Sequence, residues 1–194
     1  MVLEPRTRDA LIRALIDVEA AHERRGWNLA PTLVGVFDLP PSSPRQGVHV
    51  DAGLFGPNVW HDRVLAHGDP TLPPGVILHS LADLIASPAA RPKLRAWLNL
   101  GGRRCVAFAL VFEAWAVQGP LNYRPGDLAT APPSARIETR VVAAVDCDGQ
   151  LHQISRVRGE RQATVSRPSQ PPPGIPHSRI AAGLDRLMDL ARTH

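Results

Sequence analysis

The sequence predicts an α+β fold, in which an antiparallel sheet of about four strands has helices mainly on one face and a C-terminal helix joined through a proline-rich linker. Three observations lead to this prediction. Residues 105–117 form a long apolar run between glycine and proline breakers. Residues 136–158 alternate in polarity around an Asp148-Gly149 turn, which is typical of a β-hairpin. Segments with helical periodicity lie before and after these strands.

The first two predicted elements are a helix over residues 7–25 and a short strand over residues 32–38. Apolar residues recur at helical spacing in the first segment, and Thr7 or Asp9 can cap its start. The second segment has a β-branched, apolar centre and ends at two prolines. A helix followed by a strand therefore opens the predicted domain.

Residues 39–75 resist assignment because prolines and glycines recur throughout them. A long irregular excursion of this kind is unusual in a compact domain and is often functional. A short helix is expected near residues 59–66, and a more strongly periodic one over residues 76–86. A further helix is expected to follow, with Ser87 as its N-cap and Pro88 at its first position.

The apolar run at residues 105–117 has three interpretations: a membrane anchor, a buried helix or a core strand. Its 13 residues fall short of the roughly 18 that a membrane-spanning helix needs. Periodicity does not separate a buried helix from a buried strand. The abundance of Val, Phe and Trp, together with the flanking breakers, favours a strand that is buried on both faces.

We expect a single domain over residues 1–167, a stiff linker over residues 168–177 and an amphipathic helix over residues 178–194. This helix is too short to be stable alone in water, so its apolar stripe has to be buried. It can pack against its own domain or, as an exchanged arm, against a second copy. The residues of the stripe are Ile180, Leu184, Leu187 and Met188.

The composition is that of an ordinary globular protein, with 44% hydrophobic and 21% charged residues. Two cysteines and the lack of an apolar N-terminal leader lead us to expect a cytoplasmic protein without a membrane partner. The net charge of +4 permits a nucleic-acid partner without establishing one. Arginine far outnumbers lysine, which is typical of a GC-rich genome such as that of an actinobacterium or of its phage.

Histidines and aspartates gather between residues 49 and 83, and imidazole with carboxylate is the ligand chemistry of hydrolytic metal sites. Their spacing matches no metal-binding motif, however. We therefore expect no metal and no cofactor, and keep a metal-dependent hydrolase as one alternative. Its candidate ligands are His49, His61, His67 and Asp69.

A second candidate site is the group of arginines at the end of the predicted hairpin. Arg156, Arg158 and Arg161 could contact the phosphates of a nucleic acid. No aromatic residue interleaves with them to stack on bases, and a solvated strand face is the simpler interpretation. Because the arginines could still contact phosphates, we keep a nucleic-acid-binding accessory protein as the other alternative.

Glu113 is the only charged residue in the long apolar run. A carboxylate in a buried strand needs a charged partner, because burial without one is costly. Arg140 and Arg156, on neighbouring strands of the expected sheet, are the candidate partners. We expect these three residues to form a structural ion pair, since such networks are more often structural than catalytic.

The sequence lacks the motifs for phosphate binding, nucleophilic hydrolysis and calcium binding that would indicate a reaction. We therefore assign no catalytic residue and do not expect an enzyme. The leading prediction is a non-enzymatic interaction protein that associates with a second copy, or with another protein, through its C-terminal helix.

Overall fold

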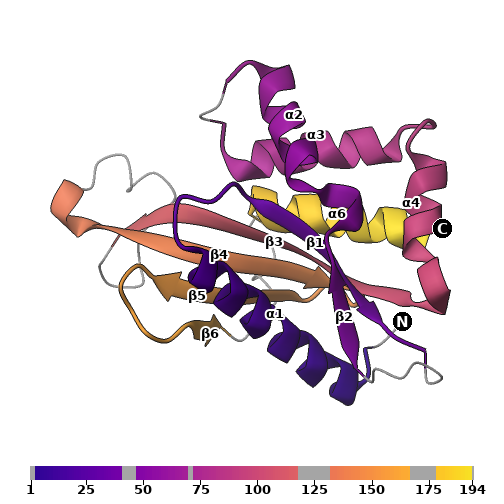
Figure 1. Cartoon of the computed structure of the whole chain (residues 1–194), viewed down its shortest axis with the longest axis horizontal. Helices are drawn as coiled ribbons and strands as arrows, with labels where there is room; N and C mark the ends of the chain where they lie inside the picture. Colours follow the sequence, from indigo (N-terminus) through magenta and orange to yellow (C-terminus); the bar gives the residue numbers. More distant parts are fainter. Residues whose placement is uncertain (1–2, 41–46, 70–71, 118–131, 167–177, 194) are drawn as a thin grey trace.

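Figure 1 shows the fold of the chain in a computed structural model. Within the described residues, the chain has an α+β fold with five α-helices and a six-stranded antiparallel sheet in the order β2-β1-β3-β4-β5-β6. The predicted class is confirmed, but the expectation of about four strands is wrong. The structure describes residues 3–40, 47–69, 72–117, 132–166 and 178–193.

The elements have the following bounds. The strands are β1 (Thr32–Asp38), β2 (Val48–Asp51), β3 (Arg104–Val117), β4 (Arg136–Asp146), β5 (Leu151–Val157) and β6 (Thr164–Ser166). The α-helices are α1 (Pro5–Arg25), α2 (Pro57–His67), α3 (Pro74–Ala86), α4 (Arg91–Leu98) and α6 (Arg179–Arg192). Short 3-10 turns are η1 (Gly53–Phe55), η2 (Leu100–Gly102) and η3 (Pro133–Ala135).

The long apolar run forms the central strand of the sheet, β3. This strand pairs with β1 from Arg104 to Val111 and with β4 from Ala107 to Val117. Partners on both sides satisfy the backbone hydrogen bonds of its buried middle, which allows an almost uninterrupted apolar sequence. The prediction of a core strand over residues 105–117 is confirmed, and the alternative of a buried helix is wrong.

The helices are divided unequally between the two faces of the sheet (Figure 1). α1 crosses one face, whereas α2, α3, α4 and α6 lie on the other side. Side chains alternate along β4, so Arg140 points toward α1, where it binds Glu23. The apolar set of β4, which includes Val141 and Val145, points to the face with four helices. Helices therefore lie mainly on one face, as predicted.

The sequence analysis does not predict two of the strands, β2 and β6. β2 lies in the proline-rich stretch that could not be assigned, and it pairs with β1 over only four positions. β6 is a three-residue strand that pairs with β5. Segments this short contain too few residues to show a periodicity, and their pairing depends on the neighbouring strand.

The starts of two helices differ from the sequence prediction. Ser87 ends α3 and Pro88 lies in a turn, so neither residue begins α4. The N-cap of α1 is Glu4, which makes no side-chain capping bond, and Thr7 and Asp9 lie inside the helix. α1, α2, α3 and α4 each have a proline at the first or second helical position, where its missing N–H costs no hydrogen bond.

The β4–β5 hairpin turns at the predicted Asp148-Gly149 pair and is held by Asp146. One carboxylate oxygen of Asp146 accepts hydrogen bonds from the backbone N–H groups of Asp148 and Gln150, each at 2.9 Å. The other oxygen lies 2.8 Å from Nε2 of the buried His152. Burial alone would raise the pKa of Asp146, but these hydrogen bonds outweigh burial and lower it.

The C-terminal helix α6 packs against β3, β4 and α3 of its own chain. Its N-cap is Ser178, whose hydroxyl accepts a hydrogen bond from the N–H of Ala181. Gly75 of α3 and Gly183 of α6 permit close contact between the two helices, since a Cβ at Gly183 would lie 2.8 Å from Leu78. α6 thus belongs to the same core as the sheet. The predicted linker at residues 168–177 lies outside the described residues.

Among the described residues, none of the helices combines the length and the hydropathy that crossing a membrane requires.

Candidate functional site

A buried ion cluster lies between α1 and the sheet. It consists of Glu19, Glu23, Glu113, Arg140 and Arg156. Arg140 lies 3.2 Å from Glu113 and 2.7 Å from Glu23, and its side chain is 1% exposed. Arg156 makes a two-pronged contact of 2.7 and 2.6 Å with the carboxylate of Glu19, which is fully buried. Three carboxylates therefore surround two guanidinium groups beneath the helix.

The ion cluster ties the N-terminal helix to the sheet. The structure brings Glu113 and Arg140 together, whereas Arg156 binds Glu19 in place of Glu113. Sequence analysis misses Glu19, although a signal for it exists. Leu11, Leu15 and Glu19 follow each other at intervals of four along the buried stripe of α1. A carboxylate in an apolar stripe predicts a buried cationic partner.

The arginines proposed for phosphate contact have separate environments. Arg156 is buried and also donates to the backbone carbonyls of Glu160 and Arg161, so its guanidinium is not available at the surface. Arg158 is half-exposed and forms an ion pair with Glu138. Arg161 is exposed. Of the three arginines predicted to contact phosphates, only Arg158 and Arg161 are therefore accessible at the surface.

An aromatic residue does accompany one of these arginines, Arg158, and also contacts Arg140 of the ion cluster. The guanidinium carbon of Arg140 lies 4.2 Å from the ring centroid of Trp27, and that of Arg158 lies 5.5 Å from it. Sequence analysis misses this contact because Trp27 comes from the loop after α1, far from the hairpin in sequence. Only the packing of α1 on the sheet places its ring there.

The histidines and aspartate considered as metal ligands do not converge. His49 lies on β2, His61 and His67 lie on α2, and Asp69 follows that helix. In the described part of the chain, no three His, Cys, Asp or Glu side chains gather closely enough to hold a metal ion. The geometry therefore lends no support to a hydrolytic metal centre built from these residues.

The apolar stripe of the C-terminal helix is used within its own chain. Leu184, Leu187 and Met188 are buried in the core, and Ile180 packs against that core while partly exposed. This conformation leaves no unpaired apolar face on α6 for a second copy. If the protein associates with itself in this conformation, another surface has to make the contact.

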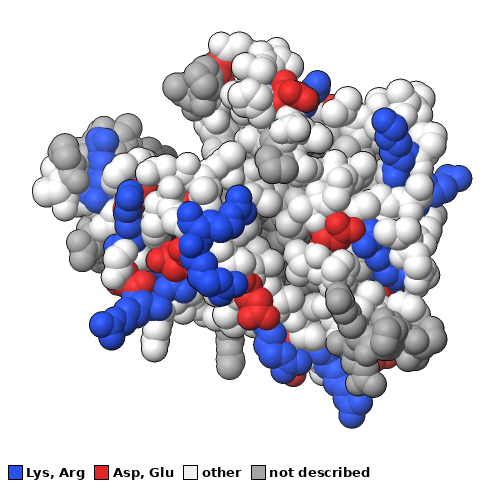
Figure 2. Space-filling model, viewed as in Figure 1, with Lys and Arg blue, Asp and Glu red and all other residues white. Residues whose placement is uncertain are grey.

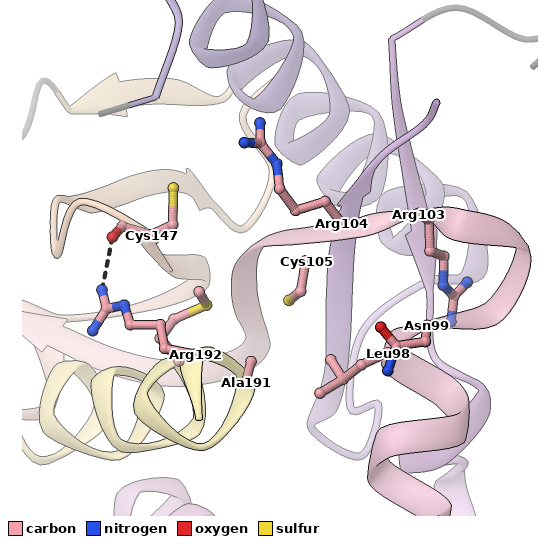
Figure 3. Close-up of a pocket in the computed structure, with 9 residues that line it drawn as sticks. Leu98, Asn99, Arg103, Arg104, Cys105, Cys147, Ala191 and Arg192 are labelled. Atoms are coloured by element: carbon pink, nitrogen blue, oxygen red, sulfur yellow. Dashed lines mark hydrogen bonds between the residues drawn. The ribbon is translucent and has the colours of Figure 1, made fainter. Parts of the chain in front are cut away.

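A cavity of about 410 Å³ opens where α4 and α6 meet the end of the sheet (Figure 3). Leu98 of α4 and Met188 and Ala191 of α6 form much of its apolar wall, and the thiols of Cys105 and Cys147 complete it. Both cysteines are free. Burial raises the pKa of Cys105 to about 12, and burial also raises the pKa of Cys147. Neither thiol is therefore a nucleophile at neutral pH.

The far end of β3 carries the most exposed aromatic side chain among the described residues. β1 pairs with β3 no further than Val111, and the ribbon of β3 and β4 projects beyond the rest of the sheet (Figure 1). Over residues 112–117, no strand of the described chain pairs with the outer edge of β3. Trp115, which is 57% exposed, lies on this ribbon opposite Glu138.

Comparisons with protein families, with curated proteins and with solved structures found no match to this chain.

Proposed function

We propose that the protein is a non-enzymatic interaction module that associates with a second copy of itself through the outer edge of β3 at residues 112–117. The observation that carries this proposal is that no strand among the described residues pairs with that edge. A long apolar edge strand presents unpaired N–H and C=O groups and is a template for pairing with another strand. The two free thiols fit a reducing compartment, and we place the module in the cytoplasm.

Edge strands that stay unpaired are commonly protected by outward charges, prolines or short length. The edge at residues 112–117 has none of these devices. Its single charge, Glu113, is turned to Arg140 and to the backbone N–H of Asn28, which donates to it at 2.7 Å. The sheet's other edges are shorter, since β2 has four residues and β6 has three.

An antiparallel pairing of two β3 edges is self-complementary. Centred near Trp115, it sets the two indole rings side by side on the same face and brings no like charges into opposition. Burying the exposed part of one Trp side chain contributes roughly 3 kcal/mol. Two such contributions offset only part of the association cost of about 4–15 kcal/mol, so a weak, concentration-dependent dimer is expected.

The test is sedimentation velocity of the full chain and of two matched variants across micromolar concentrations. Trp115→Lys places an edge charge on β3, and we expect it to remain monomeric where the parent protein dimerises. Leu100→Lys makes the same chemical change at a comparably exposed residue, 62% exposed on η2, and we expect it to dimerise like the parent. A parent protein that is monomeric throughout, or variants that dimerise equally, would contradict the proposal.

A second candidate function is binding of a single-stranded nucleic acid, which the contact of Trp27 with Arg158 favours. Figure 2 shows arginine side chains gathered over the C-terminal end of α1, on the face that carries this contact. Acidic side chains lie among them, which makes the face less suited to phosphates than to protein. Salt-dependent binding of an oligonucleotide that weakens in Arg158→Ala but persists in Trp115→Lys would favour this candidate over the dimer.

A further inference from the structure

A second cavity, of about 350 Å³, lies where α3 ends and α4 begins. Pro88 holds the preceding Ser87 in an extended conformation, with a ψ of 148°, which ends α3. α4 then leaves at a steep angle to α3 (Figure 1). Leu54 and Phe55 of η1 and Val59 of α2 form another part of the wall. We call this cavity the α3–α4 pocket.

The α3–α4 pocket has an apolar floor and an accessible mouth. Phe55 and Ile85 line it and are only 3% and 5% exposed, so they form its floor. Leu84, which is 37% exposed, lines it together with the exposed residues Ala89 and Lys93. These three residues mark the mouth, so the folded chain leaves apolar surface in contact with water there.

Lys93 is the only charged residue among the described residues that line this pocket. It is also the only lysine of the chain. Within the described part of the chain, its ammonium group has no hydrogen bond or ion pair. α4 carries two further basic residues, Arg91 and Arg95, and the sequence has no acidic residue between Asp83 and Glu113. The charge that α4 brings to the mouth therefore favours an anion over a cation.

We propose that the α3–α4 pocket binds an amphiphilic carboxylate of the medium-chain fatty acid class. Its hydrocarbon chain lies against Phe55, Leu84 and Ile85, and its carboxylate stays at the mouth beside Lys93. The volume of about 350 Å³ is within the usual range for small-molecule sites of roughly 300–1,000 Å³. No described lining residue belongs to β3, so the site does not depend on the proposed dimer.

The apolar wall and the lysine have different tasks in this site. Each methylene that the wall removes from water should strengthen binding about fourfold, until the chain fills the pocket. The ammonium group stands on a flexible four-carbon stem, so it can follow a carboxylate that remains partly hydrated. An exposed ion pair of this kind strengthens binding by about fivefold at most. The hydrocarbon chain therefore supplies most of the affinity, and Lys93 supplies the preference for an anion.

The first test titrates the full chain with octanoate, butyrate and octan-1-ol by isothermal calorimetry. Octanoate should bind saturably at one site. Butyrate lacks four methylenes and should bind on the order of a hundredfold more weakly. Octan-1-ol keeps the chain but lacks the charge, and it should bind about three- to fivefold more weakly than octanoate. No saturable binding of octanoate, or an affinity for octan-1-ol that equals or exceeds it, would overturn the proposal.

Four variants assign the binding to this pocket. Lys93→Met should weaken octanoate about three- to fivefold and leave octan-1-ol unchanged, whereas Lys93→Arg should keep the preference for octanoate. Arg13→Met is the matched control, because Arg13 is an exposed basic residue of α1 on the opposite face of the sheet. It should change neither affinity. Ala89→Phe fills the mouth from an exposed turn position and should weaken both ligands while the urea midpoint stays that of the parent protein.

The single lysine also allows a direct reading of the site. Reductive methylation with carbon-13 formaldehyde labels the amine of Lys93 and the N-terminal amine alone, because the chain has no other lysine. Octanoate should shift the nuclear magnetic resonance signal of Lys93 with the dissociation constant that calorimetry gives. A Lys93 signal that stays in place while octanoate binds, or equal effects of Lys93→Met and Arg13→Met, would place the ligand elsewhere and overturn the proposal.

Discussion

Glu19 offers the sharpest test of how α1 is held on the sheet. Its fully buried carboxylate accepts two hydrogen bonds from Arg156 and lies 3.6 Å from Arg140. Glu19→Gln keeps the size of the side chain but leaves two guanidinium groups with one carboxylate fewer. Removing one partner of a buried ion pair costs about 3–5 kcal/mol, because the remaining charge stays desolvated. That loss is a large share of the ~5–15 kcal/mol that stabilises a typical domain.

The assay is urea unfolding at neutral pH, followed by far-ultraviolet circular dichroism. Glu138→Gln is the matched control, because its ion pair with Arg158 has a half-exposed guanidinium. We expect the control to lose no more than about 1 kcal/mol in the free energy of unfolding. If Glu19→Gln loses no more than the control does, then the ion cluster does not hold α1, and the apolar contacts of that helix are sufficient.

Two further predictions concern the helix docking and the hairpin. Gly183→Ala should lower the free energy of unfolding by about 1–3 kcal/mol, since the new methyl group meets Leu78 at 2.8 Å; a wild-type urea midpoint would refute the close contact. Because the pKa of Asp146 is lowered in the folded chain, its contribution to stability is complete above its unfolded pKa of about 4 and is lost as pH falls through the lower folded value. Asp146→Asn should therefore reduce the loss of unfolding free energy on going to acid pH. An unchanged pH dependence would contradict the lowered pKa of Asp146.

Much of the fold follows from local sequence patterns. β1 occupies the predicted residues 32–38, and α6 begins within one residue of the predicted start. The β4–β5 hairpin turns where the Asp-Gly pair indicates, because this turn depends on a left-handed backbone at Gly149. β2 could not be predicted, since its four residues become a strand only through pairing with β1.

The site residues were harder to predict because their partners are distant in sequence. The need of Glu113 for a cationic partner is local information, and it predicts Arg140 and Arg156, of which the structure pairs only Arg140 with Glu113. Which carboxylate Arg156 binds depends on how α1 crosses the sheet. Because Glu19 and Arg156 are 137 positions apart, no local sequence pattern indicates their contact. The cavity arises in the same way, since Cys105 and Ala191 meet only after α6 has docked.

The docking of α6 also affects how the chain is made. Its apolar stripe covers β3 and β4, yet α6 follows every strand in chain order. A ribosome adds ~5–20 residues per second, so on the order of several seconds separate the completion of β3 from the appearance of α6. During this interval the part of β3 and β4 that α6 covers in the finished fold has no contact with that helix. The nascent protein therefore offers a transient binding surface to chaperones, and to neighbouring nascent chains, that the finished protein lacks.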